Sequence, residues 1–152
     1  MHMKRAEVVL LSVRSPHVER ILDGIKTVEI RRRPVRVKPG TRVLLYAAAT
    51  RKELVGSFRV GVVVSATPLA LWKRHQGEIG LSANDFYEYL RGASVGHAIP
   101  IADVRSLEEP IPLGELRRRW TRFSAPQTHR FVHPKELGSI LNGERDVLLP
   151  NS

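Results

Sequence analysis

Three charged side chains at short spacing, Lys26, Glu29 and Arg31, form the group best suited to chemistry in this sequence. In an extended strand Glu29 and Arg31 point to one side, while Val28 and Ile30 point to the other and can enter a core. Lys26 and Arg31 could bind a phosphate or a base carbonyl, and an ionised Glu29 could accept a hydrogen bond from an exocyclic amine. The same residues could instead form ordinary ion pairs on a solvated face.

Nine further residues could complete a cleft around these charges. They are Ser12, Arg14, Arg32, Arg33, Tyr46, Ser94, His97, Gln127 and Arg130. The ring of Tyr46 could stack on an unpaired base or simply pack at the end of a barrel. The glycine before His97 allows a close approach of a ligand or only a tight turn, and Gln127 and Arg130 could belong to a surface loop.

The histidines do not form a metal-binding pattern. His97, His129 and His133 lack a tight spacing with carboxylates. The chain also contains no cysteine, so neither a thiolate zinc site nor a disulfide can form. We therefore expect no metal and no cofactor.

The elements around the charged group are well marked. Residues 7–13 are an apolar, β-branched run of strand length, and Ser15 and Pro16 are typical of the N-cap and the first position of a helix. Residues 27–33 have the pattern of a second strand. We expect Gly24 to be structural, because a helix that ends just before a strand needs a residue with positive φ.

The rest of the chain mixes strands with short helices. Further strands are expected at 42–48, 53–65, 95–104 and 147–149, and helices after Thr67, after Ser82, from Pro112 and over 134–142. Gly56 and Gly61 would let a strand bend or bulge, and Trp72 and Trp120 occupy helical core positions. Because strands and helices do not alternate regularly, the expected fold class is α+β, a partly open β-barrel with short helices packed around it.

The formal net charge of +10 and the pI near 10.8 predict attraction to polyanions. Residues 31–42 contain six basic residues and no acid, and residues 117–122 add a group of arginines on a helix. Both segments could guide phosphates toward a cleft. Charge alone does not select among RNA, DNA and an acidic membrane.

A DNA-binding regulator is one alternative. Helices at 68–76 and 83–91 are separated by a short turn, as in a helix-turn-helix. The second of these helices carries Asp85 and Glu88, which would present acid to the major groove. This composition argues against the alternative without removing DNA as a possible partner.

We expect one domain, because 152 residues with 42% hydrophobic composition suffice for one core. Its core is placed at about 7–133, with 134–152 as a C-terminal extension and residues 1–2 as a cloning remnant. No apolar run approaches the roughly 20 residues of a membrane span, and the N-terminus lacks the apolar stretch of a signal peptide. We expect a cytoplasmic monomer or weak homodimer that does not bind a membrane.

Gly24, Lys26, Glu29 and Arg31 resemble the GxKxxExR signature of the ASCH domain family, within the PUA-like superfamily, at all four positions. The order of the neighbouring segments is also similar, so the resemblance covers roughly residues 8–133. It implies a PUA-like barrel with a cleft between helix and sheet. It also implies recognition of RNA, either single-stranded or carrying a modified base, so the leading prediction is a nucleic-acid-binding module.

The resemblance implies a hydrolase as a further alternative, since some family members are nucleases. A related amidohydrolase removes the acetyl group of N4-acetylcytidine and has the same lysine as Lys26, but a threonine nucleophile where this chain has Glu29. Thr27 does not occupy that position, and Glu78 only loosely matches the third catalytic group. Lys26 and Glu29 could still act as acid and base on a modified nucleoside or on RNA if burial shifted their pKa values.

Overall fold

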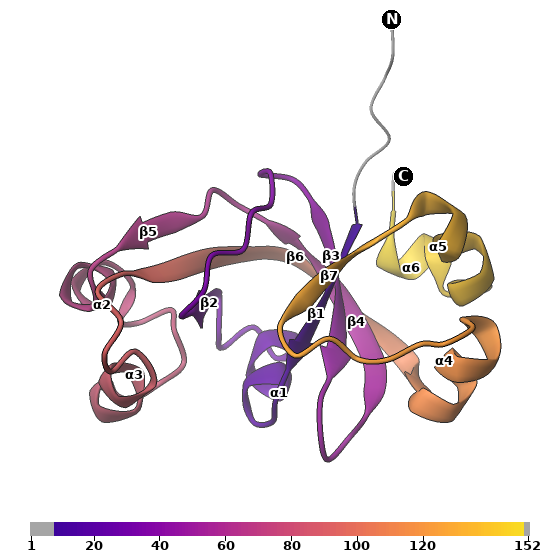
Figure 1. The fold of residues 1–152 in the computed structure, drawn as a ribbon, viewed down its shortest axis with the longest axis horizontal. Helices are drawn as coiled ribbons and strands as arrows, with labels where there is room; N and C mark the ends of the chain where they lie inside the picture. Colours follow the sequence, from indigo (N-terminus) through magenta and orange to yellow (C-terminus); the bar gives the residue numbers. More distant parts are fainter. Residues whose placement is uncertain (1–7, 151–152) are drawn as a thin grey trace, which may run out of the picture.

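The computed structural model describes residues 8–150. Its strands are β1 (Val8–Val13), β2 (Val28–Arg31), β3 (Arg42–Ala47), β4 (Glu53–Val60), β5 (Val64–Ala66), β6 (Gly96–Pro112) and β7 (His129–Val132). Its helices are α1 (His17–Leu22), α2 (Pro68–His75), α3 (Ala83–Tyr89), α4 (Leu113–Arg119), α5 (Pro134–Ile140) and α6 (Arg145–Leu148) (Figure 1). Within residues 8–150, none of these helices has the length and apolar character needed to cross a membrane.

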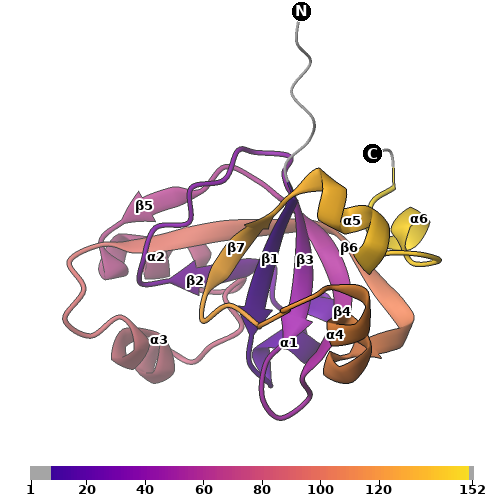
Figure 2. The ribbon, with the colours of Figure 1, turned by 45° about the vertical axis from the view of Figure 1, so that its right-hand side comes forward.

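The seven strands form a strongly curled sheet with the order β2-β6-β4-β3-β1-β7, and β5 pairs with β6. β1 and β3 run parallel, whereas the other pairs are antiparallel. The first residues of β6 pair with β2 and β5 and its later residues pair with β4, so this long strand links β2 and β5 to the part of the sheet formed by β4, β3, β1 and β7 (Figure 2). Short helices surround this half-barrel, which confirms the expected α+β class.

Helix starts were predictable where a hydroxyl caps the backbone. The side chain of Thr67 accepts a hydrogen bond from the Ala70 amide at 3.2 Å and opens α2. The side chain of Ser82 accepts one from the Asp85 amide at 3.1 Å and opens α3. Both caps satisfy amides that a helix leaves without an internal partner.

Two glycines bend the sheet between β4 and its neighbours. The pairing register shifts next to Gly56 on both sides of β4, and a Cβ atom there would meet the carbonyl oxygen of Arg105. A Cβ atom on Gly61 would lie 2.9 Å from Cβ of Pro100. The single strand expected over 53–65 is therefore wrong, because the chain leaves the ladder at Gly61 and re-enters it as β5.

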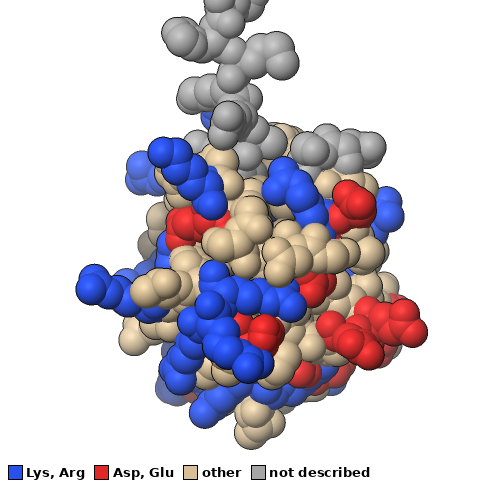
Figure 3. Space-filling model, turned by 90° about the vertical axis from the view of Figure 1, so that its right-hand side faces the viewer, with Lys and Arg blue, Asp and Glu red and all other residues tan. Residues whose placement is uncertain are grey.

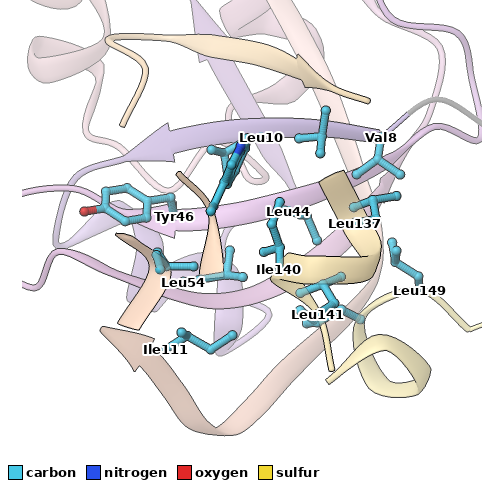
Figure 4. Close-up of a cluster of buried hydrophobic side chains, with 14 of the residues drawn as sticks. Val8, Leu10, Leu44, Tyr46, Leu54, Ile111, Leu137, Ile140, Leu141 and Leu149 are labelled. Atoms are coloured by element: carbon cyan, nitrogen blue, oxygen red, sulfur yellow. The ribbon is translucent and has the colours of Figure 1, made fainter. Parts of the chain in front are cut away.

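The middle of the sheet is buried on both faces. Leu10 belongs to a cluster that includes Trp120 and residues of α4, α5 and α6 (Figure 4), and Leu11 belongs to a second cluster with residues of α1. In a third cluster Trp72 packs against Phe86, which joins α2 and α3 to β2. Both tryptophans therefore serve packing, as expected.

The C-terminal segment differs from the prediction. Residues 145–148 form the helix α6 instead of leading into a strand, and the carbonyl oxygen of Leu148 accepts hydrogen bonds from Arg42 Nε at 2.9 Å and Ser57 Oγ at 2.7 Å. β7 was not predicted, and it pairs antiparallel with β1 at the edge of the sheet. Both corrections arise from partners that are distant in sequence.

Candidate functional site

The turn between α1 and β2 places the charged motif. Gly24 has a φ of 78° and donates its amide to the last turn of α1, so its expected structural role is confirmed. The amide of Lys26 then donates to the carbonyl of Arg20 at 3.0 Å. At the other end of α1 the predicted cap is wrong, because the hydroxyl of Ser15 donates to the carboxylate of Glu19 at 2.6 Å.

Glu29 lies between two cations, as strand geometry predicts. Its Oε2 atom lies 2.7 Å from Nη2 of Arg31, and its Oε1 atom lies 3.3 Å from Nζ of Lys26. Arg31 also donates to the carbonyl of Ser12 at 2.9 Å, which ties β2 to the end of β1. Lys26 is 1% exposed and Glu29 is 6% exposed, so the interpretation as a solvated ion pair is wrong.

The segment between α2 and α3 covers Lys26. Nζ of Lys26 donates to the carbonyl of Ile79 at 2.5 Å, and Nη1 of Arg20 donates to the carbonyl of Gly80 at 2.7 Å. Gly80 has a φ of 71°, and a Cβ atom there would lie 3.1 Å from Cβ of Lys26. The ammonium group is therefore held in place by backbone as well as by Glu29.

Burial and neighbouring charge act in opposite directions on these groups. Burial lowers the pKa of Lys26 below its ordinary value, and the carboxylate of Glu29 only partly offsets this effect. Burial acts to raise the pKa of Glu29, but the charges of Arg31 and Lys26 outweigh it and hold that pKa below its ordinary value. Glu29 is ionised at neutral pH and can only accept hydrogen bonds.

A pocket of about 600 Å³ opens beside this network, a volume typical of ligand sites. Six predicted site residues line it: Ser12, Arg14, Lys26, Glu29, Arg31 and Gln127. Four cationic side chains and only two carboxylates contribute to the lining, so the pocket favours an anionic ligand. Among residues 8–150 no group of three or more histidines and carboxylates could hold a metal ion.

The pocket also contains residues that the sequence did not single out for a site, namely His17, Arg20, Asp85 and Tyr89, and it contains Thr128 from the polar cluster around Gln127. His17 and Arg20 lie three residues apart on α1, and this spacing beside the motif was an available signal. Thr128 joins the pocket because its carbonyl accepts from the amide of Ser12 at 3.0 Å. No local pattern could link Asp85 and Tyr89 to the motif, since α3 reaches it only through tertiary packing.

Two predicted site residues lie outside the pocket, where Tyr46 is buried in the hydrophobic cluster that contains Trp120 and Arg130 is half-buried against that tryptophan. Tyr46 is 2% exposed and its ring packs 5.8 Å from that of Phe123, so it cannot stack on a ligand in the pocket (Figure 4). The guanidinium of Arg130 lies 4.4 Å from the ring centroid of Trp120 and pairs with Glu136 at 3.1 Å. Alternation along β3 and β7 points both side chains toward this core.

Four other predicted residues also lie outside the pocket lining. Nδ1 of His97 is 2.7 Å from the hydroxyl of Ser65 on the paired strand β5, and Ser94 is exposed before β6. Arg32 donates to two carbonyls at the end of α3, at 2.9 Å and 2.7 Å, and Arg33 is exposed. The proposed nucleic-acid contacts of these residues are thus not part of the pocket.

Each of the two basic segments contains arginines that are paired with a carboxylate. Within residues 31–42, Arg42 is buried and pairs with Asp103 at 2.8 Å, so it cannot guide phosphates. On the face formed by α4, α5 and α6, basic side chains gather in the middle with acidic ones among and beside them (Figure 3). Arg118 and Arg119, for example, both pair with Glu115.

Comparison with known proteins identifies a matching family and several similar proteins. The family model for the ASCH domain matches residues 11–121. A Zymomonas mobilis protein described as an ASCH domain-containing ribonuclease is 27% identical over 122 residues, which are 80% of this chain and 82% of that protein. The crystal structure of ASCH from Zymomonas mobilis aligns with a TM-score of 0.82 and 26% identity over 87% of this chain and 92% of that one. Human THYN1, solved in complex with DNA containing 5-methylcytosine, shares the fold at 12% identity and a TM-score of 0.56, over 87% of this chain and 94% of that one.

Proposed function

The chain belongs to the ASCH domain family, and we propose that it binds RNA and takes one unpaired nucleotide into the pocket beside Lys26, Glu29 and Arg31. One observation carries this proposal: a buried, fixed charge network lies at a pocket whose lining is predominantly positive. The side chains of a surface ion pair are mobile and would lose conformational entropy when a ligand binds. Side chains that are fixed before the ligand arrives lose little.

A nucleotide offers a matching group to each part of the pocket. Its phosphate meets Arg14, which is exposed, and the guanidinium of Arg31. An exocyclic amine of the base donates to the ionised carboxylate of Glu29, and Gln127 and Thr128 supply neutral donors and acceptors. These contacts need base edges that are hidden in an RNA double helix. The RNA is therefore single-stranded or has a base splayed out of the duplex.

Cleavage of the bound RNA is a second candidate function. It is favoured by the similarity of this chain, over most of its length, to a protein described as a ribonuclease. The pocket brings cationic groups together with a histidine, a combination that suits reactions at a phosphodiester. A single-stranded RNA that enters the pocket is the substrate class this candidate implies.

Deacylation of a modified nucleoside receives less support from the geometry. That reaction would need Glu78 near Lys26, but the Glu78 carboxylate is half-exposed and lies 3.0 Å from Nδ1 of His75. Only the backbone of Glu78 approaches the motif, through its carbonyl, which accepts from the amides of Thr27 and Val28. A modified base remains a suitable ligand for the pocket, though not a substrate for that constellation.

The experiment that tests RNA binding is fluorescence anisotropy with single-stranded RNA, duplex RNA and duplex DNA of matched sequence across a salt series. We expect single-stranded RNA to bind most tightly. The Arg14→Gln variant should weaken this binding about tenfold, or about 1.4 kcal/mol, at fixed salt. Arg118→Gln, which removes the same charge from an exposed position on α4, should change only the shared salt dependence.

The two variants separate pocket binding from general attraction to polyanions. If the three nucleic acids bind alike and Arg14→Gln behaves as Arg118→Gln does, the pocket is not a polynucleotide site. Free nucleotides would then be titrated into the protein instead of polynucleotides. If duplex DNA binds best, the regulator alternative replaces RNA recognition.

A further inference from the structure

His17 is the pocket residue whose environment the binding proposal does not explain. It is the first residue of α1, half-buried, and lines the pocket with Lys26, Glu29 and Arg31. Its Nδ1 atom is buried and has no hydrogen-bond partner among the residues that the structure describes. A buried polar atom without a partner is costly, so its retention points to a role with a ligand.

The charges that face His17 are mostly positive. They come from Arg20 on its own helix, Lys26 in the following turn, and Glu29 and Arg31 on β2. Burial is the largest cause that lowers the pKa of His17 below 6.5, and Lys26 lowers it further, while Glu29 opposes them. The imidazole is therefore neutral at neutral pH and has a lone pair that can accept a proton.

The other titratable groups of the pocket are less suited to accept a proton. Glu29 has both carboxylate oxygens engaged by cations. Lys26 is 1% exposed and its ammonium group is held by the Ile79 carbonyl. Arginine side chains stay protonated. Among the buried and half-buried side chains of the pocket, only His17 combines a free nitrogen with an ordinary pKa near neutrality.

We propose that His17 is the catalytic base for cleavage of a single-stranded RNA bound in this pocket; the proposal rests on the RNA-binding function proposed above. His17 takes the proton of a ribose 2′-hydroxyl, and the 2′-oxygen forms a bond to the adjacent phosphorus. The bond from phosphorus to the 5′-oxygen breaks. The departing 5′-oxygen takes a proton from water, and the imidazolium gives its proton to the hydroxide that remains.

The products are a strand with a 2′,3′-cyclic phosphate and a strand with a free 5′-hydroxyl. The reaction needs no oxidant, reductant or second substrate. The fixed cations beside His17 stabilise the negative charge that grows on the phosphoryl oxygens. Arg31 and the exposed Arg14 line the pocket where this charge would develop. The same cations also disfavour an imidazolium in the resting pocket, which keeps the base ready.

The test compares single-turnover cleavage of a single-stranded RNA by the wild type, His17→Asn and His133→Asn. Asparagine keeps hydrogen bonding at position 17 but cannot act as a base, so we expect a loss of at least 100-fold. His133 caps α5 away from the pocket, and asparagine is a good cap, so this control should cleave normally. Affinity is measured separately with a 2′-O-methyl strand, which cannot react, and His17→Asn should bind it within threefold of the wild type.

The pH profile supplies a readout that a purely structural role would not change. The wild-type rate should rise with pH as the imidazole loses its proton, and the midpoint of this rise should lie below pH 6.5, because burial and the charge of Lys26 hold the pKa of His17 below that value. His17→Ala should recover part of the activity when imidazole is added. Melting curves show which variants are folded. If His17→Asn folds poorly, the imidazole rescue of folded His17→Ala still tests the role of the base.

Each outcome decides the proposal. A 2′,3′-cyclic phosphate, lost with His17→Asn and restored to His17→Ala by imidazole, supports it. Wild-type protein that binds RNA in the pocket without cleaving it overturns the catalytic role and leaves the binding function standing. Cleavage that continues in folded His17→Asn and His17→Ala, or that also occurs with a 2′-deoxy strand, overturns the mechanism. Failure of the wild type to bind any RNA removes the binding function as well.

Discussion

Oε2 of Glu29 lies 2.7 Å from Nη2 of Arg31 in a pair whose side chains are only 9% and 11% exposed. The second carboxylate oxygen faces Lys26, so one anion compensates two buried cations. Burial makes each of these charges expensive to leave alone. The motif is therefore a structural unit as well as part of the pocket lining.

Glu29→Gln should lower the free energy of unfolding by about 3 kcal/mol, because it leaves the buried Lys26 and Arg31 without a compensating charge. Urea denaturation followed by circular dichroism measures this change. The matched control is Glu88→Gln, which breaks an exposed pair with Arg91 and should cost less than about 1 kcal/mol. Equal losses in the two variants would contradict the buried network.

Gly80→Ala should destabilise the protein more than Gly92→Ala does. Both glycines have positive φ, 71° and 81°, so each alanine carries the same backbone cost of about 1 kcal/mol. Only at Gly80 would the new Cβ atom lie 3.1 Å from Cβ of Lys26, whereas nothing lies within 4 Å at Gly92. Thermal unfolding of both variants checks the difference, and equal melting temperatures would show that the backbone at Gly80 does not pack tightly against Lys26.

The contribution of Glu29 to stability should disappear in acid. Its pKa in the folded protein lies below the ordinary value of 4.5, so the unfolded chain takes up the proton first as the pH falls. The stabilisation is fully present above pH 4.5 and is lost as the pH falls through the folded pKa.

Urea denaturation from pH 7 to pH 3 measures this effect as the difference in unfolding free energy between the wild type and Glu29→Gln. We expect the difference to shrink below pH 4.5. A difference that stays constant down to pH 3 would mean that Glu29 has no charge-dependent role at these pH values. The corresponding difference for Glu88→Gln should stay small throughout.

Arg42→Met should release α6 from the sheet. The substitution removes both the hydrogen bond to the Leu148 carbonyl and the ion pair with Asp103. We expect the free energy of unfolding to fall by about 2 kcal/mol. Hydrogen exchange of the α6 amides should accelerate. Arg105→Met is the matched control, because Arg105 also pairs with Asp103 but is 44% exposed and does not contact Leu148. Unchanged exchange in Arg42→Met would show that this anchor does not hold α6.

The sequence by itself determined the local geometry of the site. The phase of a strand is two residues, so Glu29 and Arg31 had to share a face once residues 28–31 were extended. The left-handed backbone at Gly24 and the hydroxyl caps at Thr67 and Ser82 also depend only on neighbouring residues. The ASCH resemblance then predicted the curled sheet that these elements form. The family match confirms the resemblance itself.

Only the tertiary structure decided which surfaces meet. Tyr46 alternates correctly along β3 but turns toward Phe123, because the pocket lies elsewhere. His17 becomes a candidate base only when α1, β2 and the segment before α3 enclose one space. Residues 147–149 suit a strand or a helix equally, and partners 91 and 106 residues away select the helix. Local patterns determine which way a side chain points along its own element, whereas long-range packing determines what it faces.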